Sequence, residues 1–374
     1  MRVVELGAFG SPPAPVVAIH FAPDSQSFAA VRRLDTWVVG LSWYDLRRNE
    51  AVVPTPGDPD HGGGAEEDAG YAPDPVLSAD HRFLAYVYIG RGPEYFLKLI
   101  DRAAPKRSKR RERHLTALEW EGYHNAQTYL ALRFSPDGQF LVAGVIAGDE
   151  LEEDTRSGIY WWRVNSVLAG RGPRSNGEFL PEKRYLPTPR PDVWNYNSAR
   201  SLAFTPDGTV LAAGLWQAQV SRWEFASGRG LPPLGVTPRR AKSRRRHPAP
   251  TPAWRLAFSA DGQTLAVADE TVTFYEANTA APRATLPAGP SVRHGPGRPP
   301  GPSVLDLSFH SSESLLATAC GDEVLRWWDG LTGAARQTFD CGVGPLTAVA
   351  FSPDGCVCAA GGEGGHVALV DVDR

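Results

Sequence analysis

The chain has 374 residues, which is enough for one large all-β domain or two ordinary domains. Its formal net charge of -3 excludes a global positive field that would attract nucleic acid or an anionic membrane, so an electrostatic partner must be recognised by a local patch. No apolar run approaches the roughly 18 residues of a membrane span, and the N-terminus lacks the apolar core of a signal peptide. We therefore expect a cytoplasmic protein with no membrane partner.

One phrase recurs seven times along the chain: alternating apolar residues, Phe, a small polar residue, Pro or Ala, Asp and usually Gly. The copies lie at residues 19–24, 76–80, 132–138, 202–208, 256–262, 307–312 and 349–355, and the second and sixth are degraded. Pro, Asp and Gly in this order are typical of a tight turn between two strands. Each copy therefore predicts a first strand that ends in a hairpin.

Further strands follow each turn in chain order, and their alternation of apolar and polar residues favours strand over helix. Second strands are expected at 140–146, 210–216, 264–269 and 315–320. Third strands are expected at 40–45, 159–164, 220–225, 272–277, 324–329 and 367–372, and weaker fourth strands at 115–120, 183–187, 284–287 and 335–339. The pairs Trp161–Trp162 and Trp327–Trp328 fall on third strands, so we expect each pair to pack against two neighbouring units.

Seven copies of a four-stranded antiparallel unit, none of which can bury both faces alone, predict an all-β chain folded as a single seven-bladed β-propeller. An apolar strand at 3–9 is expected to pair with the last blade and close the ring. We place the blades at about 15–53, 72–120, 128–187, 198–236, 252–287, 303–340 and 345–374 plus 1–9. Loop insertions are expected at 54–75, 103–114, 147–157, 237–251 and 288–303, with a shorter one at 169–177.

The pattern resembles the WD-repeat (WD40) family. The resemblance is carried by the FSPDG-like turns and by third strands that close on Trp328-Asp329 and Trp223-Glu224, within the phrases WDGLTG and WEFASG. The chain departs from the family in lacking the Gly-His pair before every first strand, and it has Tyr275-Glu276 at one Trp-Asp position. The resemblance implies a buried Asp–His–Ser–Trp network, which these departures predict to be incomplete.

The resemblance also implies that loops between blades, and loops between second and third strands, share one face, the top face. The repeat alignment sends five residues to the top of blades four and five: Trp194, Tyr196, Arg200, Trp216 and Trp254. Half-exposed Trp, Tyr and Arg are the residue types that anchor interfaces. The first function hypothesis is therefore a non-catalytic scaffold that binds a protein or peptide here; alternatively, the rings only fill gaps between blades.

Two other functions stay open. A nucleic-acid-binding propeller would use the basic loop after residue 238, with Arg239, Arg240, Lys242, Arg244, Arg245 and Arg246, although such a loop can equally be a solvated insertion. An enzyme would have its site at the mouth of the central channel, but the sequence has no GxSxG, Walker, HExxH or dinucleotide motif and recommends no catalytic residue.

The four cysteines, Cys320, Cys341, Cys356 and Cys358, lie in the last sixth of the chain and form no disulfide framework. Their spacing does not match a zinc site, so we expect no metal and no cofactor. Cys356 and Cys358 are two residues apart, which predicts that both pack on one face of a strand. Arginine outnumbers lysine, Met occurs once and Gly and Pro are abundant, a composition typical of a GC-rich bacterial genome.

Overall fold

The computed structural model describes most of the chain. The described residues are 1–6, 14–33, 39–52, 73–89, 95–105, 108, 112–115, 127–147, 158–169, 174–175, 178–179, 183–187, 199–215, 219–234, 255–268, 271–286 and 304–372. Their regular structure is β-strand except for the short helix α1 (Val164–Leu168). The strands form seven four-stranded antiparallel sheets and one two-stranded hairpin.

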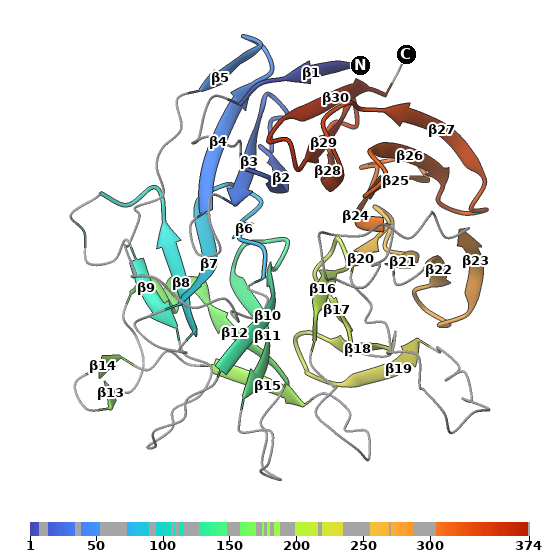
Figure 1. The fold of residues 1–374 in the computed structure, drawn as a ribbon. Coiled ribbons are helices and arrows are strands. Elements are labelled where there is room, and N and C mark those ends of the chain that lie inside the picture. Colours follow the sequence, from blue (N-terminus) through green and yellow to red (C-terminus); the bar gives the residue numbers. More distant parts are fainter. Residues whose placement is uncertain are drawn as a thin grey trace, which may run out of the picture. The chain divides into compact units, whose positions relative to one another are not determined.

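Five of the seven four-stranded sheets are built from four consecutive strands of the chain; blade three skips a two-stranded hairpin, and blade seven takes the first strand of the chain as its fourth strand (Figure 1). Blade one contains β2 (Val16–Phe21), β3 (Ser27–Arg33), β4 (Val39–Asp45) and β5 (Glu50–Val52). Blade two contains β6 (Val76–Leu77), β7 (Phe83–Ile89), β8 (Tyr95–Asp101) and β9 (Glu112–Leu115). Blade three contains β10 (Gln127–Phe134), β11 (Phe140–Ala147), β12 (Gly158–Arg163) and β15 (Lys183–Pro187).

The remaining blades repeat the order. Blade four contains β16 (Ser201–Phe204), β17 (Val210–Gly214), β18 (Val220–Glu224) and β19 (Gly230–Leu234). Blade five contains β20 (Arg255–Phe258), β21 (Thr264–Ala268), β22 (Val272–Glu276) and β23 (Pro282–Leu286). Blade six contains β24 (Val304–Phe309), β25 (Leu315–Cys320), β26 (Val324–Asp329) and β27 (Ala335–Asp340). Blade seven contains β28 (Leu346–Phe351), β29 (Val357–Gly362) and β30 (Val367–Asp371), and its fourth strand is β1 (Arg2–Val4).

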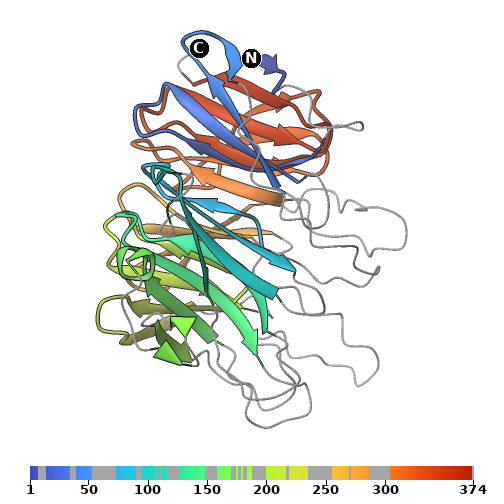
Figure 2. The same ribbon diagram turned by 90° about the vertical axis from the view of Figure 1, so that its left-hand side faces the viewer.

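This architecture is the predicted seven-bladed β-propeller, and its closure is also confirmed. β1 pairs antiparallel with β30, with Val3 opposite Ala368. Both Figures 1 and 2 show blue β1 beside the red strands of the last blade. The two ends of the chain thus complete one sheet, and each covers an edge that the other would leave unpaired.

The chain divides into two compact units. One unit comprises Met1–Asp35, Val39–Gly57 and Ala203–Arg374, and the other comprises Thr36–Val38 and Asp58–Leu202. In the first unit, Trp327 packs in a cluster with Leu346 and Phe351 of blade seven, whereas Trp328 packs in a separate cluster with Phe274 of blade five. The prediction that adjacent tryptophans face different blades is therefore confirmed for this pair.

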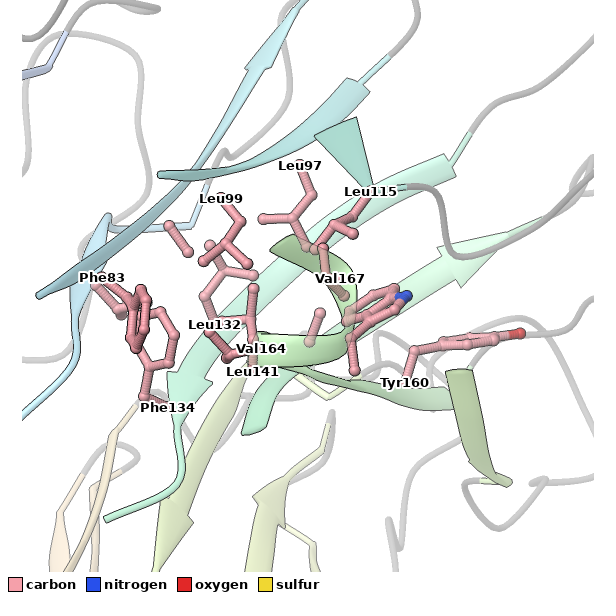
Figure 3. Close-up of a cluster of buried hydrophobic side chains, with 14 of the residues drawn as sticks. Phe83, Leu97, Leu99, Leu115, Leu132, Phe134, Leu141, Tyr160, Val164 and Val167 are labelled. Atoms are coloured by element: carbon pink, nitrogen blue, oxygen red, sulfur yellow. The ribbon is translucent and has the colours of Figure 1, made fainter. Parts of the chain in front are cut away.

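The core of the second unit lies between the sheets of blades two and three. The two leucines of β8, Leu97 and Leu99, pack there with Leu132 and Leu141 of blade three (Figure 3). Trp162 of β12 belongs to the same cluster. The helix α1 adds Val164 and Val167 to this cluster. These side chains come from two blades, so neither sheet could bury them alone.

The recurring turn is stabilised by the same hydrogen bonds in most blades. In five blades the Ser or Thr hydroxyl binds the carboxylate two residues later, as in Ser135–Asp137 and Thr205–Asp207, at 2.5–2.6 Å. The carboxylate also accepts the backbone N–H two residues beyond itself, for example that of Gln139 at 3.0 Å. These bonds replace the backbone partners that a tight turn leaves unmet.

In the degraded sixth copy, the turn is stabilised by hydrogen bonds of a histidine side chain. The His310 ring nitrogen Nδ1 accepts the backbone N–H groups of Ser312 at 3.2 Å and Glu313 at 2.9 Å. Its Nε2 donates to the carbonyl oxygen of Gly355 in blade seven at 2.9 Å. The buried imidazole thus replaces the Ser–Asp pair and also bridges two blades.

Three local predictions differ from the structure. The fourth strand of blade two begins at Glu112, inside the expected insertion 103–114: Glu112 lies opposite Ile100 in the ladder, and its carboxylate forms an ion pair with buried Lys98 at 3.0 Å. The expected third strand 159–164 ends at Arg163, directly before α1, and the expected insertion 169–177 contains β13 (Arg174–Ser175), which pairs with β14 (Glu178–Phe179). Cys356 precedes its strand and is exposed, whereas Cys358 is buried, so the two thiols do not share a face.

Candidate partner-binding site

Arg200 is the predicted anchor residue that lies among the described residues. It is half-buried and immediately precedes β16. The backbone before it is seated against blade three, because a Cβ atom on Gly144 of β11 would lie 2.3 Å from the carbonyl oxygen of Ala199. The close approach of two backbones therefore requires glycine at 144 and fixes the chain that carries Arg200.

The other proposed anchors, Trp194, Tyr196, Trp216 and Trp254, lie outside the described residues. So do all six basic residues of the alternative nucleic-acid site: Arg239, Arg240, Lys242, Arg244, Arg245 and Arg246. Of the insertions, 54–72, 148–157, 237–251 and 288–303 also lie outside. The grouping of the five anchors accordingly stays a prediction.

An ion pair lies next to one of these anchor positions. Arg255 begins β20 directly after Trp254, and its Nε is 3.4 Å from Oδ1 of Asp306 on β24, the first strand of the next blade. The other carboxylate oxygen of Asp306 accepts the backbone N–H of Val349 on β28 at 2.9 Å. Because the Arg255 and Asp306 side chains remain 33% and 24% exposed, the pair presents both charges at the surface.

Neighbouring first strands are joined by further side-chain bonds. The hydroxyl of Ser308 accepts the backbone N–H of Phe351 at 3.3 Å, and the hydroxyl of Thr347 donates to the carbonyl oxygen of Val16 in blade one. These bonds and the Asp306 contacts link the first strands of blades five, six, seven and one. Sequence reasoning missed the role of Asp306; the available signal was an acidic residue inside the apolar run of a first strand.

The predicted tryptophan network is present in reduced form in blade six. The indole Nε1 of Trp328 donates to the hydroxyl of Thr318 at 3.0 Å, and Asp322 forms a bidentate pair with Arg326, at 2.9 and 2.6 Å. In blade four the register places Ala213 at the Thr318 position, so no hydroxyl there can receive the ring N–H of Trp223. In blade five both partners differ, with Val267 and Tyr275 at the two positions. The expectation of an incomplete network is therefore met in these blades.

Replacement of Thr318 by Val should lower the free energy of unfolding by about 1–3 kcal/mol, because it leaves the Trp328 N–H buried without its acceptor. Urea titration followed by circular dichroism would measure the change. Thr285→Val is the matched control, since its hydroxyl is exposed and bonds only to the hydroxyl of Thr273 among the described contacts. Equal midpoints for the two variants would contradict a structural role for the Trp328–Thr318 bond.

Two loops of blades six and seven are of the kinds that the resemblance assigns to the top face: the turn between β29 and β30, and the link between β27 and β28. The turn between β29 and β30 packs on the link between β27 and β28: the N–H of Gly364 donates to the carbonyl oxygen of Val343 at 3.2 Å, and that of Glu363 to Pro345 at 2.9 Å. A Cβ atom on Gly362 would lie 2.1 Å from the same Val343 oxygen. This corner is thus held by backbone contacts between two blades.

The thiols and acidic groups give no metal-binding arrangement among the described residues: no group of three or more His, Cys, Asp or Glu side chains could hold a metal ion there. The four cysteines are free. Burial raises the pKa of Cys341 to about 11 and also raises that of Cys320, which keeps both thiols protonated and unreactive at neutral pH.

No helix in the described part of the chain is long and apolar enough to span a membrane.

Comparison with known families agrees with the geometry. The family model WD40 (WD domain, G-beta repeat) matches residues 294–329 and 334–371, which contain most of blades six and seven. No curated protein matches the chain. The two matched repeats include the Trp328–Thr318 bond and the closing strand β30, and the other five sheets repeat the same strand order. Together, the matched repeats and the seven four-stranded sheets identify the chain as a WD-repeat β-propeller.

Proposed function

We propose that this propeller is a non-catalytic scaffold that binds a protein or peptide at the top of blades four and five, with five anchors: Trp194, Tyr196, Arg200, Trp216 and Trp254. WD-repeat propellers commonly serve as protein-interaction scaffolds. The four free thiols suit a reducing cytoplasm, where we place the protein.

The observation that supports this site most is the position of two of its residues, each of which directly precedes the first strand of a blade. Arg200 immediately precedes β16, as Trp254 immediately precedes β20, so the two residues occupy equivalent positions where the chain enters consecutive blades. Arg200 is half-buried, which leaves part of a large side chain available to a partner. Arginine and tryptophan at such positions combine apolar area with hydrogen-bond donors, the combination found at interface hot spots.

The neighbouring Arg255–Asp306 pair adds a second reason. Arg255 directly follows Trp254 in the chain, and its partner Asp306 is held by the backbone N–H of Val349. Both side chains are partly exposed. A fixed pair of opposite charges beside an apolar anchor favours a partner that offers hydrogen bonds as well as apolar surface. We therefore expect a partner segment with a mixed apolar and polar sequence.

Alanine substitution of Trp216 and Trp254 together should weaken partner binding at least about 30-fold, the effect of losing one hot-spot residue of about 2 kcal/mol. Partners captured by the wild-type chain would be titrated against each variant, and thermal melting would confirm that each variant is folded. Leu331→Ala is the control, because Leu331 is an apolar side chain that is 53% exposed on the turn after β26. Unchanged affinity of a folded double variant would reject the site.

The nucleic-acid alternative predicts a different response. A loop with six basic residues would release counterions on binding, so its affinity for DNA or RNA would fall steeply with salt. Anisotropy of a labelled oligonucleotide at two salt concentrations would detect this dependence. Tight binding that weakens with salt, and that is lost when the six residues are replaced by Ser, would move the proposal from protein to nucleic acid.

A further inference from the structure

The outer strand of blade six differs from the other described outer strands in its length and in its lack of proline. Among the described outer strands, β1 and β5 have three residues each and β9 has four. Those of blades three, four and five have five residues and contain proline: Pro187, Pro232, Pro233 and Pro282. Short length and proline are the usual protections of a sheet edge against pairing with another chain. β27, with six residues and no proline, has neither of these two protections. Its one irregularity is a bulge at Arg336, because Trp327 lies opposite Gln337 and Trp328 lies opposite Ala335.

The free backbone groups of β27 can be assigned from its register. Cys341, just after the strand, donates its N–H to the carbonyl oxygen of Glu323 at 3.4 Å, and Asp340 lies opposite Val324. Because hydrogen-bonded and non-hydrogen-bonded pairs alternate in an antiparallel ladder, the N–H and C=O groups of Asp340 and Thr338 point away from β26. Figure 1 shows β27 as the outermost strand of its sheet.

The sequence of this edge is complementary to itself. β27 reads ARQTFD, with Arg336 and Asp340 at equal distances on either side of Thr338. In an antiparallel pair centred on Thr338, Arg336 of each copy would lie opposite Asp340 of the other, and the two threonines would face each other. Opposite charges and Thr–Thr pairs directly across an antiparallel pair stabilise it.

The side chains needed for this pairing are accessible. Asp340 and Thr338 are exposed, and the Arg336 side chain is 61% exposed. Arg336 already binds Asp329 at the base of the turn, but a guanidinium has five N–H donors and can serve a second carboxylate. Phe339 packs on Trp327 with ring centroids 4.7 Å apart, which anchors the C-terminal half of the strand to its blade.

We propose that β27 pairs antiparallel with β27 of a second copy of this chain, about a two-fold axis at Thr338, so that two blades join into one continuous eight-stranded sheet. The partner is thus an identical chain, and the surface is distinct from the top-face loops of the proposed function. A C2 interface of this kind uses the same residues on both copies. A strand pair of this length is smaller than a standard interface, so we expect a dissociation constant in the micromolar range.

Sedimentation equilibrium of the full chain over a range up to about 100 µM would test the proposal, since this range spans micromolar dissociation constants. We expect a monomer–dimer equilibrium for the wild type. Asp340→Arg places like charges opposite each other twice and should raise the dissociation constant about tenfold or more. Glu313→Arg makes the same change of charge at an exposed turn of the same blade and should leave the constant unchanged.

A second variant tests the backbone pairing itself. Thr338→Pro removes an N–H that points away from the blade, so it should abolish the dimer. Thermal melting would show whether Thr338→Pro is folded. If Thr338→Pro does not fold, Asp340→Arg still tests the pairing, because it leaves the backbone of β27 unchanged. A wild type that stays monomeric throughout the range would overturn the proposal. So would a dimer whose dissociation constant is the same in Asp340→Arg and Glu313→Arg.

Discussion

Replacement of Gly362 by Ala is expected to destabilise the propeller by about 3 kcal/mol or more. The added Cβ atom would lie 2.1 Å from the carbonyl oxygen of Val343 and 2.9 Å from its carbonyl carbon. These atoms belong to the backbone between β27 and β28, so no side-chain rotation can relieve the overlap. Relief requires blades six and seven to move apart at this corner, which breaks the bond from Gly364 to Val343.

The denaturation midpoint in urea would measure this loss. Gly230→Ala is the matched control, because a Cβ atom at Gly230 would meet nothing within 4 Å. That control should leave stability unchanged or raise it by about 0.4–1 kcal/mol through the unfolded state. A Gly362→Ala protein as stable as the control would contradict the close packing of the two blades.

Replacement of Trp327 by Ala should cost about 3–5 kcal/mol of unfolding free energy, the range for truncating a large aromatic in a core. Trp327 is 4% exposed, lies in the cluster between blades six and seven, and packs on Phe339 and Phe351 at centroid distances of 4.7 and 6.1 Å. Its removal therefore opens a cavity next to the sheet that closes the propeller.

The same urea titration would measure this effect, and Leu331→Ala would serve as the control for loss of an exposed apolar side chain. Because Leu331 is 53% exposed, its truncation should change stability by less than about 0.5 kcal/mol. Similar losses of unfolding free energy in the two variants would contradict a core-packing role for Trp327.

The sequence predicted the fold because its strongest signals are local and repeated. The Ser/Thr–Asp pair marks a turn whose hydrogen bonds stay within about six residues, so each copy can be recognised without knowledge of the rest of the chain. Seven copies then imply the propeller, and the unpaired strand at the N-terminus implies its closure, which β1 and β30 confirm. The two faces of the Trp327–Trp328 pair follow from strand alternation alone.

The features that sequence reasoning missed depend on contacts between distant residues. The Arg255–Asp306 pair joins strands of different blades, and the substitution of His310 for a Ser–Asp pair works because Gly355 offers its carbonyl oxygen 45 residues later. Cys356 was misassigned because a strand boundary differed by one residue: it belongs to the turn bonded to Asp354, not to β29. Of the proposed site, the structure describes Arg200, and the four aromatic anchors remain predictions.

The most direct test of the proposed function is affinity capture with the full chain from the native lysate, at low and high salt and with and without nuclease, followed by mass spectrometry. A scaffold that recognises a protein should retain the same proteins after nuclease treatment and at high salt, because apolar anchors are not screened by ions. Loss of all retained proteins on nuclease treatment or at high salt would contradict the protein-binding scaffold and would favour the basic loop after residue 238 as the binding element.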